Sequence, residues 1–189
     1  MILAAGASRR LGHPKQLVKR KHTTLLNHTI EQAQGSQVGN VFVALGSSFK
    51  EILPTLDNNI HTIFIHDWHE GMGQSIAESI EVIEKEKFDA IIVSVCDQPF
   101  ISEKQFRDLK HAYECDDFSI VVSRYSDSKG PPTLFDKQHF EALKNLTGDD
   151  GAKEVVRNNK DNVTHIDFPE GDIDIDTKED ERRFGYDLE

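Results

Sequence analysis

Short apolar runs alternate with amphipathic segments from one end of the chain to the other. The six apolar runs cover residues 1–5, 41–45, 62–65, 90–95, 120–123 and 163–166. The amphipathic segments, near residues 25–33, 49–56, 76–83 and 106–112, repeat apolar side chains about every 3.6 positions, as helices do. Strands that alternate with helices in this way predict β-α-β units built around a mostly parallel sheet.

The run at residues 90–95 is apolar almost throughout, which is typical of a strand buried on both faces. We therefore expect it at the centre of the sheet. Residues 129–132 contain Gly130, Pro131 and Pro132 and are expected to interrupt regular structure, so that residues 133–135 form a short antiparallel edge strand. The sequence thus predicts an α/β protein, a single-domain three-layer α/β/α sandwich over residues 1–189.

Charge and cysteine content exclude several classes of partner. The chain has 22 lysine and arginine residues against 33 aspartate and glutamate residues, a net charge of −11. Such a chain repels the phosphate backbone of nucleic acid, and no apolar run approaches the roughly 20 residues that a membrane helix needs. Cys96 and Cys115 form neither a disulfide framework nor a zinc motif, and the charge at Arg9 leaves the first apolar run too short for a signal peptide. We expect a cytoplasmic protein with no nucleic-acid or membrane partner.

A loop rich in small and basic residues follows the first apolar run. It extends from Gly6 to Lys15 and includes Ser8, Arg10 and Gly12. Small residues let backbone amides approach an anion, basic side chains neutralise it, and a loop after the first strand of an α/β sheet lies where ligands bind. The P-loop spacing is not met, and the dinucleotide motif G-x-G-x-x-G is absent. The loop is therefore either a phosphate site or an ordinary basic loop.

Asp97 comes directly after the run at residues 90–95, where its carboxylate would enter the same crevice. Mg²⁺ prefers carboxylate and phosphate oxygens, so Asp97 is a candidate metal ligand; the alternative is a carboxylate that only caps the turn before Pro99. A second carboxylate would come from the acidic segment that contains Asp167, Asp172, Asp174 and Asp176. Positions i and i+2 of an extended segment share a face, so Asp174 and Asp176 both remain open.

A second glycine-containing turn is expected at residues 68–75. Gly71 and Gly73 predict the turn, and Ser75 is expected to cap the helix that continues through Ile76.

Residues 3–17 read L-A-A-G-A-S-R-R-L-G-H-P-K-Q-L and resemble the signature L-A-A-G-x-S-x-R-[ML]-G-x-x-K-x-L of the molybdenum cofactor nucleotidyltransferases. Residues 68–75, 96–99, 148–152 and 174–180 resemble later segments of the same family, in the same order. The resemblance implies a Rossmann-like nucleotidyltransferase fold. Ala5 gives the Leu-Ala-Ala-Gly of the cytidylyltransferase branch, where the guanylyltransferase branch usually has Leu-Ala-Gly-Gly.

This resemblance also implies a reaction, the Mg²⁺-dependent transfer of CMP from CTP to the molybdopterin-bound molybdenum cofactor with release of pyrophosphate. The implied partner is a molybdenum hydroxylase of the xanthine dehydrogenase type, or its maturation factor. Three alternatives remain: a guanylyltransferase of the same family, a sugar-1-phosphate nucleotidyltransferase, and a non-catalytic cofactor carrier.

Individual residues receive roles from the resemblance. Arg10, Lys15 and Asp97 are the expected catalytic residues, with the two basic side chains on the outer phosphates, and Asp97 and Asp176 are the expected metal ligands. The nucleotide and the cofactor are expected to contact Leu3, Ala4, Ala5, Gly6, Ser8, Arg10, Lys15, Gly71 and Ser75.

The chain departs from its relatives at two places. They carry a few residues before the first strand, so we expect the natural start to lie upstream of Met1. Many of them have a polar or aromatic residue where this chain has Pro131, which affects the expected acceptor pocket.

Overall fold

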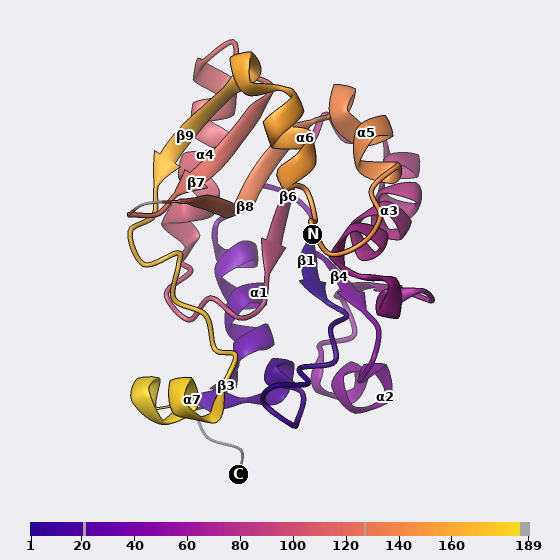
Figure 1. Cartoon of the computed structure of the whole chain (residues 1–189), viewed down its shortest axis with the longest axis vertical. Coiled ribbons are helices and arrows are strands. Elements are labelled where there is room, and N and C mark those ends of the chain that lie inside the picture. The colour runs from indigo at the N-terminus through magenta and orange to yellow at the C-terminus, as the bar shows by residue number, and fades with distance from the viewer. Residues whose placement is uncertain (21, 127, 186–189) are drawn as a thin grey trace.

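The computed structural model of the protein describes residues 1–20, 22–126 and 128–185. Its strands are β1 (Ile2–Ala4), β2 (Lys19–Arg20), β3 (Thr23–Thr24), β4 (Phe42–Leu45), β5 (His61–Phe64), β6 (Ala90–Val95), β7 (Ile120–Arg124), β8 (Lys129–Asp136) and β9 (Val163–Asp167). Its α-helices are α1 (Leu25–Gly35), α2 (Phe49–Ile52), α3 (Met72–Ile83), α4 (Glu103–Cys115), α5 (Phe140–Lys144), α6 (Lys153–Asn158) and α7 (Lys178–Phe184) (Figure 1). Residues 186–189 of the predicted domain lie outside the described ranges, and its extent as one domain stays a prediction.

Seven of these strands form one sheet in the order β5-β4-β1-β6-β8-β7-β9. β1 pairs in parallel with both β4 and β6, and β7 pairs in parallel with β9. β6 is the middle strand, which confirms the position predicted from its apolar sequence. The carboxyl ends of β1 and β6 therefore meet at one edge of the sheet.

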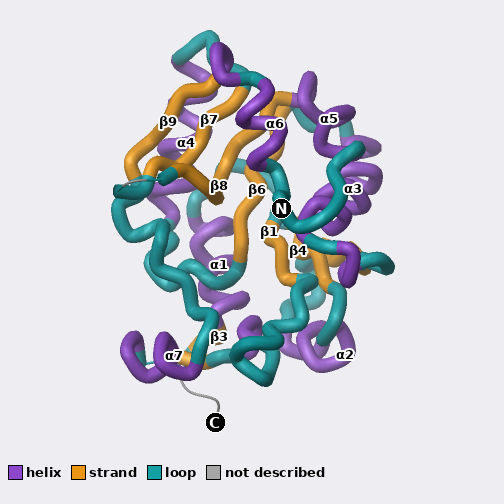
Figure 2. The backbone as a smooth tube through the Cα atoms, in the orientation of Figure 1, coloured by secondary structure: helices purple, strands orange, loops and turns teal. Residues whose placement is uncertain are grey.

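Helices cover both faces of this sheet, so the predicted three-layer α/β/α architecture is confirmed (Figure 2). On one face α3, α5 and α6 bury apolar side chains such as Ile76 and Leu143. On the other face α1, α2 and α4 bury side chains such as Ile30 and Phe106. Among the described helices, none combines the length and the apolar sequence that crossing a membrane would require.

The antiparallel direction predicted for residues 133–135 is confirmed, but the predicted interruption at residues 129–132 and the predicted edge position are wrong. These residues belong to β8, which is eight residues long and lies inside the sheet, antiparallel to both β6 and β7. Prolines lack the amide that a strand donates, but β6 pairs only with the segment after them, from Thr133 onward. On the β7 side the register shifts next to Ser123, whose hydroxyl donates to the carbonyl oxygen of Pro132 at 2.7 Å. The register shift therefore lets β8 continue through the two prolines.

A smaller apolar cluster ties the C-terminal segment to the loop after β1. Leu11 and Val18 from that region pack with Leu25 and Ile175, and Phe184 of α7 packs against them. These contacts bring two segments more than 150 residues apart to the same edge of the sheet.

Candidate active site

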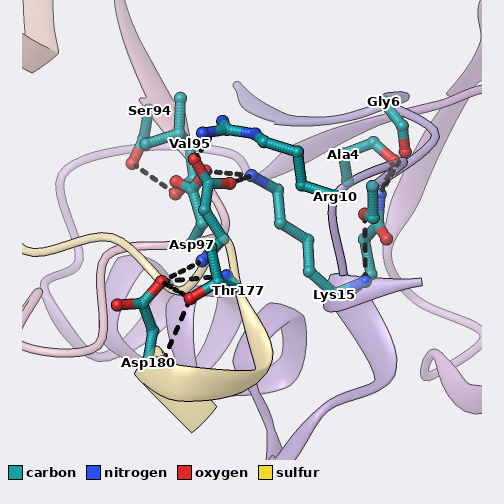
Figure 3. A network of polar contacts seen from close by, with 12 residues as sticks. Ala4, Gly6, Arg10, Lys15, Ser94, Val95, Asp97, Thr177 and Asp180 are labelled. Atoms are coloured by element: carbon teal, nitrogen blue, oxygen red, sulfur yellow. Dashed lines mark hydrogen bonds and ion pairs between the residues drawn. The ribbon is translucent and has the colours of Figure 1, made fainter. Parts of the chain in front are cut away.

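Four charged side chains from three separate segments converge at the carboxyl ends of β1 and β6. Arg10 and Lys15 lie in the loop after β1, Asp97 follows β6, and Asp176 precedes α7 (Figure 3). Open α/β sheets bind ligands beyond the carboxyl ends of their strands, so this is the expected position for a site.

The loop after β1 is folded back on itself around Ser8. This residue has a φ of 49°, its carbonyl oxygen accepts the amides of Leu11 and Gly12 at 3.1 Å each, and its hydroxyl accepts the amide of Lys15 at 3.1 Å. Gly12, with a φ of 86°, adopts a backbone conformation that glycine tolerates best. These bonds fix where Lys15 leaves the loop.

Gln16 holds the other side of the loop, and the sequence did not single it out. Its side chain is buried, and its amide nitrogen donates to the carbonyl oxygens of Ala4 at 2.8 Å and Gly6 at 3.0 Å. A glutamine next to a basic residue has no periodic signature, so only the folded loop shows its role.

The segment Gly6–Ser8 presents its backbone to open space. Within the described residues, the amides of Gly6, Ala7 and Ser8 donate to no protein acceptor. A Cβ atom placed on Gly6 would meet nothing within 4 Å. Successive unpaired amides beside basic side chains are well suited to bind phosphate oxygens.

Lys15 lies between the two carboxylates. Its ammonium donates to Oδ2 of Asp97 and, at 2.8 Å, to Oδ1 of Asp176. Burial alone would lower the pKa of Lys15, but the charge of Asp97 and the hydrogen bonds to both carboxylates outweigh it and raise that pKa above its ordinary value. Arg10 Nη2 lies 2.5 Å from Asp176 Oδ2, but its side chain is 74% exposed against 18% for Lys15. Lys15 is therefore the less exposed cation of the site, and Arg10 is the more exposed one.

Asp97 has an oxygen left over after this pairing. Its Oδ1 is buried and, among the described residues, has no hydrogen-bond partner. A buried charged oxygen without a partner is costly, which makes it fit to bind a cation. No three His, Cys, Asp or Glu side chains in the described ranges group closely enough to hold a metal ion alone. Asp97 and Asp176 fit Mg²⁺, which proteins usually hold through one or two carboxylates and substrate phosphates.

Asp174 is a further carboxylate at the same edge. Burial of its carboxyl group, followed by the negative charges of Asp97 and Asp176, raises its pKa to about 7, although the residue as a whole keeps exposed surface. The amide of Ile175 donates to the carbonyl oxygen of Asp97 at 3.0 Å, which fixes the 174–176 segment beside the site. Asp176 is the residue that contacts Lys15 and Arg10, and Asp174 lines the adjoining cavity.

Asp176 is held by the cap of α7. Thr177 and Asp180 form a reciprocal capping box, in which the Asp180 amide donates to Thr177 Oγ1 at 3.2 Å and the Thr177 amide donates to Asp180 Oδ2 at 2.8 Å. The Asp176 amide also reaches Asp180 Oδ2, at 3.3 Å. The cap therefore fixes the backbone of the carboxylate that contacts Lys15.

Thr177→Ala is expected to lower the free energy of unfolding by about 1 kcal/mol, because the first turn of α7 loses its side-chain acceptor. Ser102→Ala is the matched control: Ser102 is the N-cap residue of α4, but its hydroxyl accepts no backbone amide and donates to Gln105 Oε1 instead. Urea unfolding of both variants measures the difference. Equal losses would contradict the role given to Thr177.

The remaining predicted contact residues are more buried than expected. Leu3, Ala4 and Ala5 place their side chains in the core, with at most 9% exposed, although Leu3 also borders the cavity described below. The prediction that Ser75 caps α3 is wrong. Ser75 lies inside the helix, and its hydroxyl donates to the carbonyl oxygen of Gly71 at 3.3 Å. Gly71 is the capping residue instead, with a φ of 113°.

Gly71 has a second constraint, its packing against residues 148–152. A Cβ atom there would lie 2.4 Å from the carbonyl oxygen of Gly148, and the Gly73 amide donates to that same oxygen at 2.7 Å. Two segments that resemble the family motifs are thus in direct contact with each other.

A cavity of about 880 Å³ opens beside Asp97 and extends between the sheet and α6. Gln98 forms part of its wall. The Gln98 amide nitrogen donates to Gly171 O at 2.6 Å, Tyr125 Oη at 3.0 Å and Pro131 O at 3.1 Å, and its Oε1 has no partner among the described residues. Gln98 thus joins β8 to the C-terminal segment, a role that its place in the Cys-Asp-Gln-Pro motif did not reveal.

Comparisons with known proteins agree with this architecture. The sequence matches the family described as MobA-like NTP transferase domain over residues 1–163. It is 26% identical over 166 residues to the purine catabolism protein PucB of Bacillus subtilis (strain 168), a match that covers 83% of this chain and 79% of PucB.

Two solved structures of one mycobacterial protein share the fold. Rv0371c from Mycobacterium tuberculosis H37Rv has a TM-score of 0.82 and 26% identity, covering 96% of this chain and 93% of that chain. The complex of Rv0371c with manganese has a TM-score of 0.77 and 24% identity, covering 96% and 94%. The family match extends over most of the chain, and the chain accordingly belongs to the MobA-like NTP transferase domain family and is a nucleotidyltransferase.

Proposed function

We propose that the protein transfers CMP from CTP to the molybdopterin-bound molybdenum cofactor, with Mg²⁺ bound at Asp97 and Asp176. The observation that carries the proposal is the convergence of Lys15, Asp97 and Asp176 beside the open amides of residues 6–8. A transferring enzyme needs charge stabilisation and positioning rather than a protein nucleophile, and this cluster offers both.

Each group has a defined task in the proposed reaction. The amides of residues 6–8 and the side chains of Arg10 and Lys15 bind the outer phosphates of the nucleotide and neutralise the departing pyrophosphate. The phosphate oxygen of the acceptor forms a bond to the α-phosphorus, and the bond from that phosphorus to the bridging oxygen of pyrophosphate breaks. When bound, Mg²⁺ supplies positive charge to the phosphate oxygens. Rv0371c, which shares this fold, has been solved as a complex with manganese, which supports the use of a divalent cation.

Two further observations bear on the setting. One relative is named for purine catabolism, which supports a receiving enzyme of the xanthine dehydrogenase type, since that enzyme oxidises purines. Cys115 is an exposed free thiol, which fits the reducing cytoplasm.

Pyrophosphate release tests the proposal. Purified protein is incubated with Mg²⁺, molybdenum-loaded molybdopterin and either CTP or GTP, with reactions lacking the acceptor or containing EDTA as controls. Release that depends on acceptor, CTP and divalent cation supports the proposal. Release only with a sugar 1-phosphate as acceptor supports the sugar nucleotidyltransferase alternative, and tight binding of the cofactor without turnover supports a carrier.

Wild-type protein is expected to use CTP with a kcat/KM at least about 10-fold above that for GTP. The reason is steric: a purine is larger than a pyrimidine, and one methyl group in a close-packed pocket is worth about 1–3 kcal/mol. The family resemblance gives this role to the methyl group of Ala5, whose side chain is only 4% exposed and belongs to the same buried apolar cluster as Ile76 of α3.

Ala5→Gly is expected to narrow the gap between the two nucleotides. Glycine also loosens the end of β1, so the thermal midpoint is measured beside the kinetics, to separate base preference from stability. Equal use of CTP and GTP by the wild-type protein would assign the chain to the guanylyltransferase branch.

A further inference from the structure

The cavity beside Asp97 is separate from the loop that binds the nucleotide phosphates in the proposed function. Among the described residues that line it, none comes from the 4–17 segment, while Asp97 lies at its edge. Its floor is apolar and includes Val93 and Val95 of β6 and Val122 of β7, with Met72 from α3. A molecule in this cavity would contact Asp97, which also pairs with Lys15 of the phosphate loop. The cavity is therefore the natural acceptor pocket.

Basic side chains form one wall of this pocket. Lys153 and Arg157 lie on α6, Lys160 follows in the next turn, and all three line the cavity. Lys153 and Arg157 are four residues apart and share one face of α6. Lys160 begins the short 3-10 helix that follows α6 after its C-cap residue Asn159, and it lines the same cavity. Lys129 from the beginning of β8 is a fourth basic residue in the lining.

This row of positive charge is unusual for the chain. None of Lys153, Arg157 and Lys160 has a carboxylate partner within 4.0 Å among the described residues, although the protein as a whole carries a net charge of −11. Like charges four residues apart destabilise a helix by about 0.2–0.5 kcal/mol per pair. Five aspartates also line the cavity: Asp149 and Asp150 lie in the loop before α6, and Asp97, Asp172 and Asp174 lie on other segments. A row that costs stability and faces a cavity points to an anionic ligand.

We propose that Lys153, Arg157 and Lys160 form an anion subsite for the acceptor. The acceptor then has an apolar body over the valine floor, one phosphate that reacts at Asp97, and a second anionic group that lies under α6. This inference rests on the proposed function for the identity of the reaction, but the binding of an oxyanion to the row does not depend on it. The negative group recognised is either a phosphate or the oxo-anion of molybdenum.

A triple variant tests the subsite in the full chain. Lys153→Gln, Arg157→Gln and Lys160→Gln are combined, and the control combines Lys50→Gln, Lys85→Gln and Lys87→Gln, three exposed lysines outside the cavity. Both variants lose the same charge, so general electrostatic attraction is matched. With saturating CTP, the subsite variant is expected to raise the KM for molybdopterin at least 10-fold, with kcat and the KM for CTP within twofold of the control. An unchanged KM for the acceptor would overturn the proposal.

A binding measurement keeps the test independent of turnover. Phosphate and molybdate are titrated calorimetrically into the two triple variants, each also carrying Lys15→Gln to weaken anion binding at the loop. The control variant is expected to bind at least one oxyanion at least fivefold more tightly than the subsite variant, and the better oxyanion identifies the group. If wild-type protein shows no transfer to molybdopterin, the proposed function fails, and this titration still decides the subsite. Equal affinities in the two variants would refute it. Retained oxyanion affinity together with loss of binding to an acidic protein would instead assign the row to a protein partner.

Discussion

Replacing Asp97 by asparagine is expected to lower kcat by at least about 10²-fold while the protein remains folded. Asparagine keeps the shape of the side chain but removes its negative charge. The ion pair with Lys15 is then lost, and so is the negative charge on the buried, unpartnered Oδ1. Removal of a principal electrostatic group from an active site commonly costs a factor of this size. The measurement is pyrophosphate release at saturating CTP and Mg²⁺, with circular dichroism to confirm the fold.

Asp167→Asn is the matched control for that experiment. Asp167 belongs to the acidic segment from which the second ligand was expected, but its side chain is 66% exposed and pairs with Arg124 at the end of β9. An exposed ion pair contributes at most about 1 kcal/mol, so kcat is expected to stay within twofold of wild type. Near-normal turnover in Asp97→Asn would remove Asp97 from the metal site, whatever the control shows.

Strands β1, β4, β5, β6, β7 and β9 were predictable because each is a short apolar run with its own signal, whereas the two-residue strands β2 and β3 have no such run. β6 was located to the residue, and its position at the centre of the sheet followed from burial on both faces. β8 was predicted only from residue 133 onward, because the two prolines before it predict a break. A local pattern cannot show that Ser123 on a neighbouring strand bonds the Pro132 carbonyl oxygen, or that the register shifts there. The prediction for β8 failed because it depends on contacts with the neighbouring strand, which local propensity does not describe.

The residues of the candidate site were predictable from the sequence, but the contacts between them were not. Motif spacing identified Arg10, Lys15 and Asp97 one by one, since each follows a strand signal. Their pairing could not be derived, because Lys15 and Asp97 are 82 positions apart and meet only through the order of the strands. Gln16 and Gln98 were missed for a related reason. Their side chains bond backbone carbonyl oxygens, and any residue can supply a carbonyl.

Lys15→Gln is expected to reduce kcat/KM for the nucleoside triphosphate at least about 10²-fold. The ammonium group is the least exposed cation of the site, so its charge acts on the outer phosphates with little screening by water. Affinity for the monophosphate is expected to change much less, because the proposed partners of Lys15 are the outer phosphates. Calorimetric titration of CTP and CMP measures the difference, and equal losses for the two nucleotides would contradict the assignment.

The same substitution is expected to have the opposite effect on a divalent cation alone. In the wild-type protein the Lys15 ammonium contacts both Asp97 and Asp176, so a metal ion that approaches these carboxylates without nucleotide must displace a resident positive charge. Glutamine removes that charge and leaves two facing carboxylates, which repel each other until a cation binds. Mn²⁺ titration followed by paramagnetic resonance should therefore show tighter binding in Lys15→Gln than in wild type. Arg10→Gln, which removes an exposed cation that contacts Asp176 alone, should show a smaller gain. Weaker Mn²⁺ binding in Lys15→Gln would mean that the carboxylates bind metal only when Lys15 positions them. In the expected case, the triphosphate draws Lys15 away from the carboxylates, and nucleotide binding itself creates the metal site.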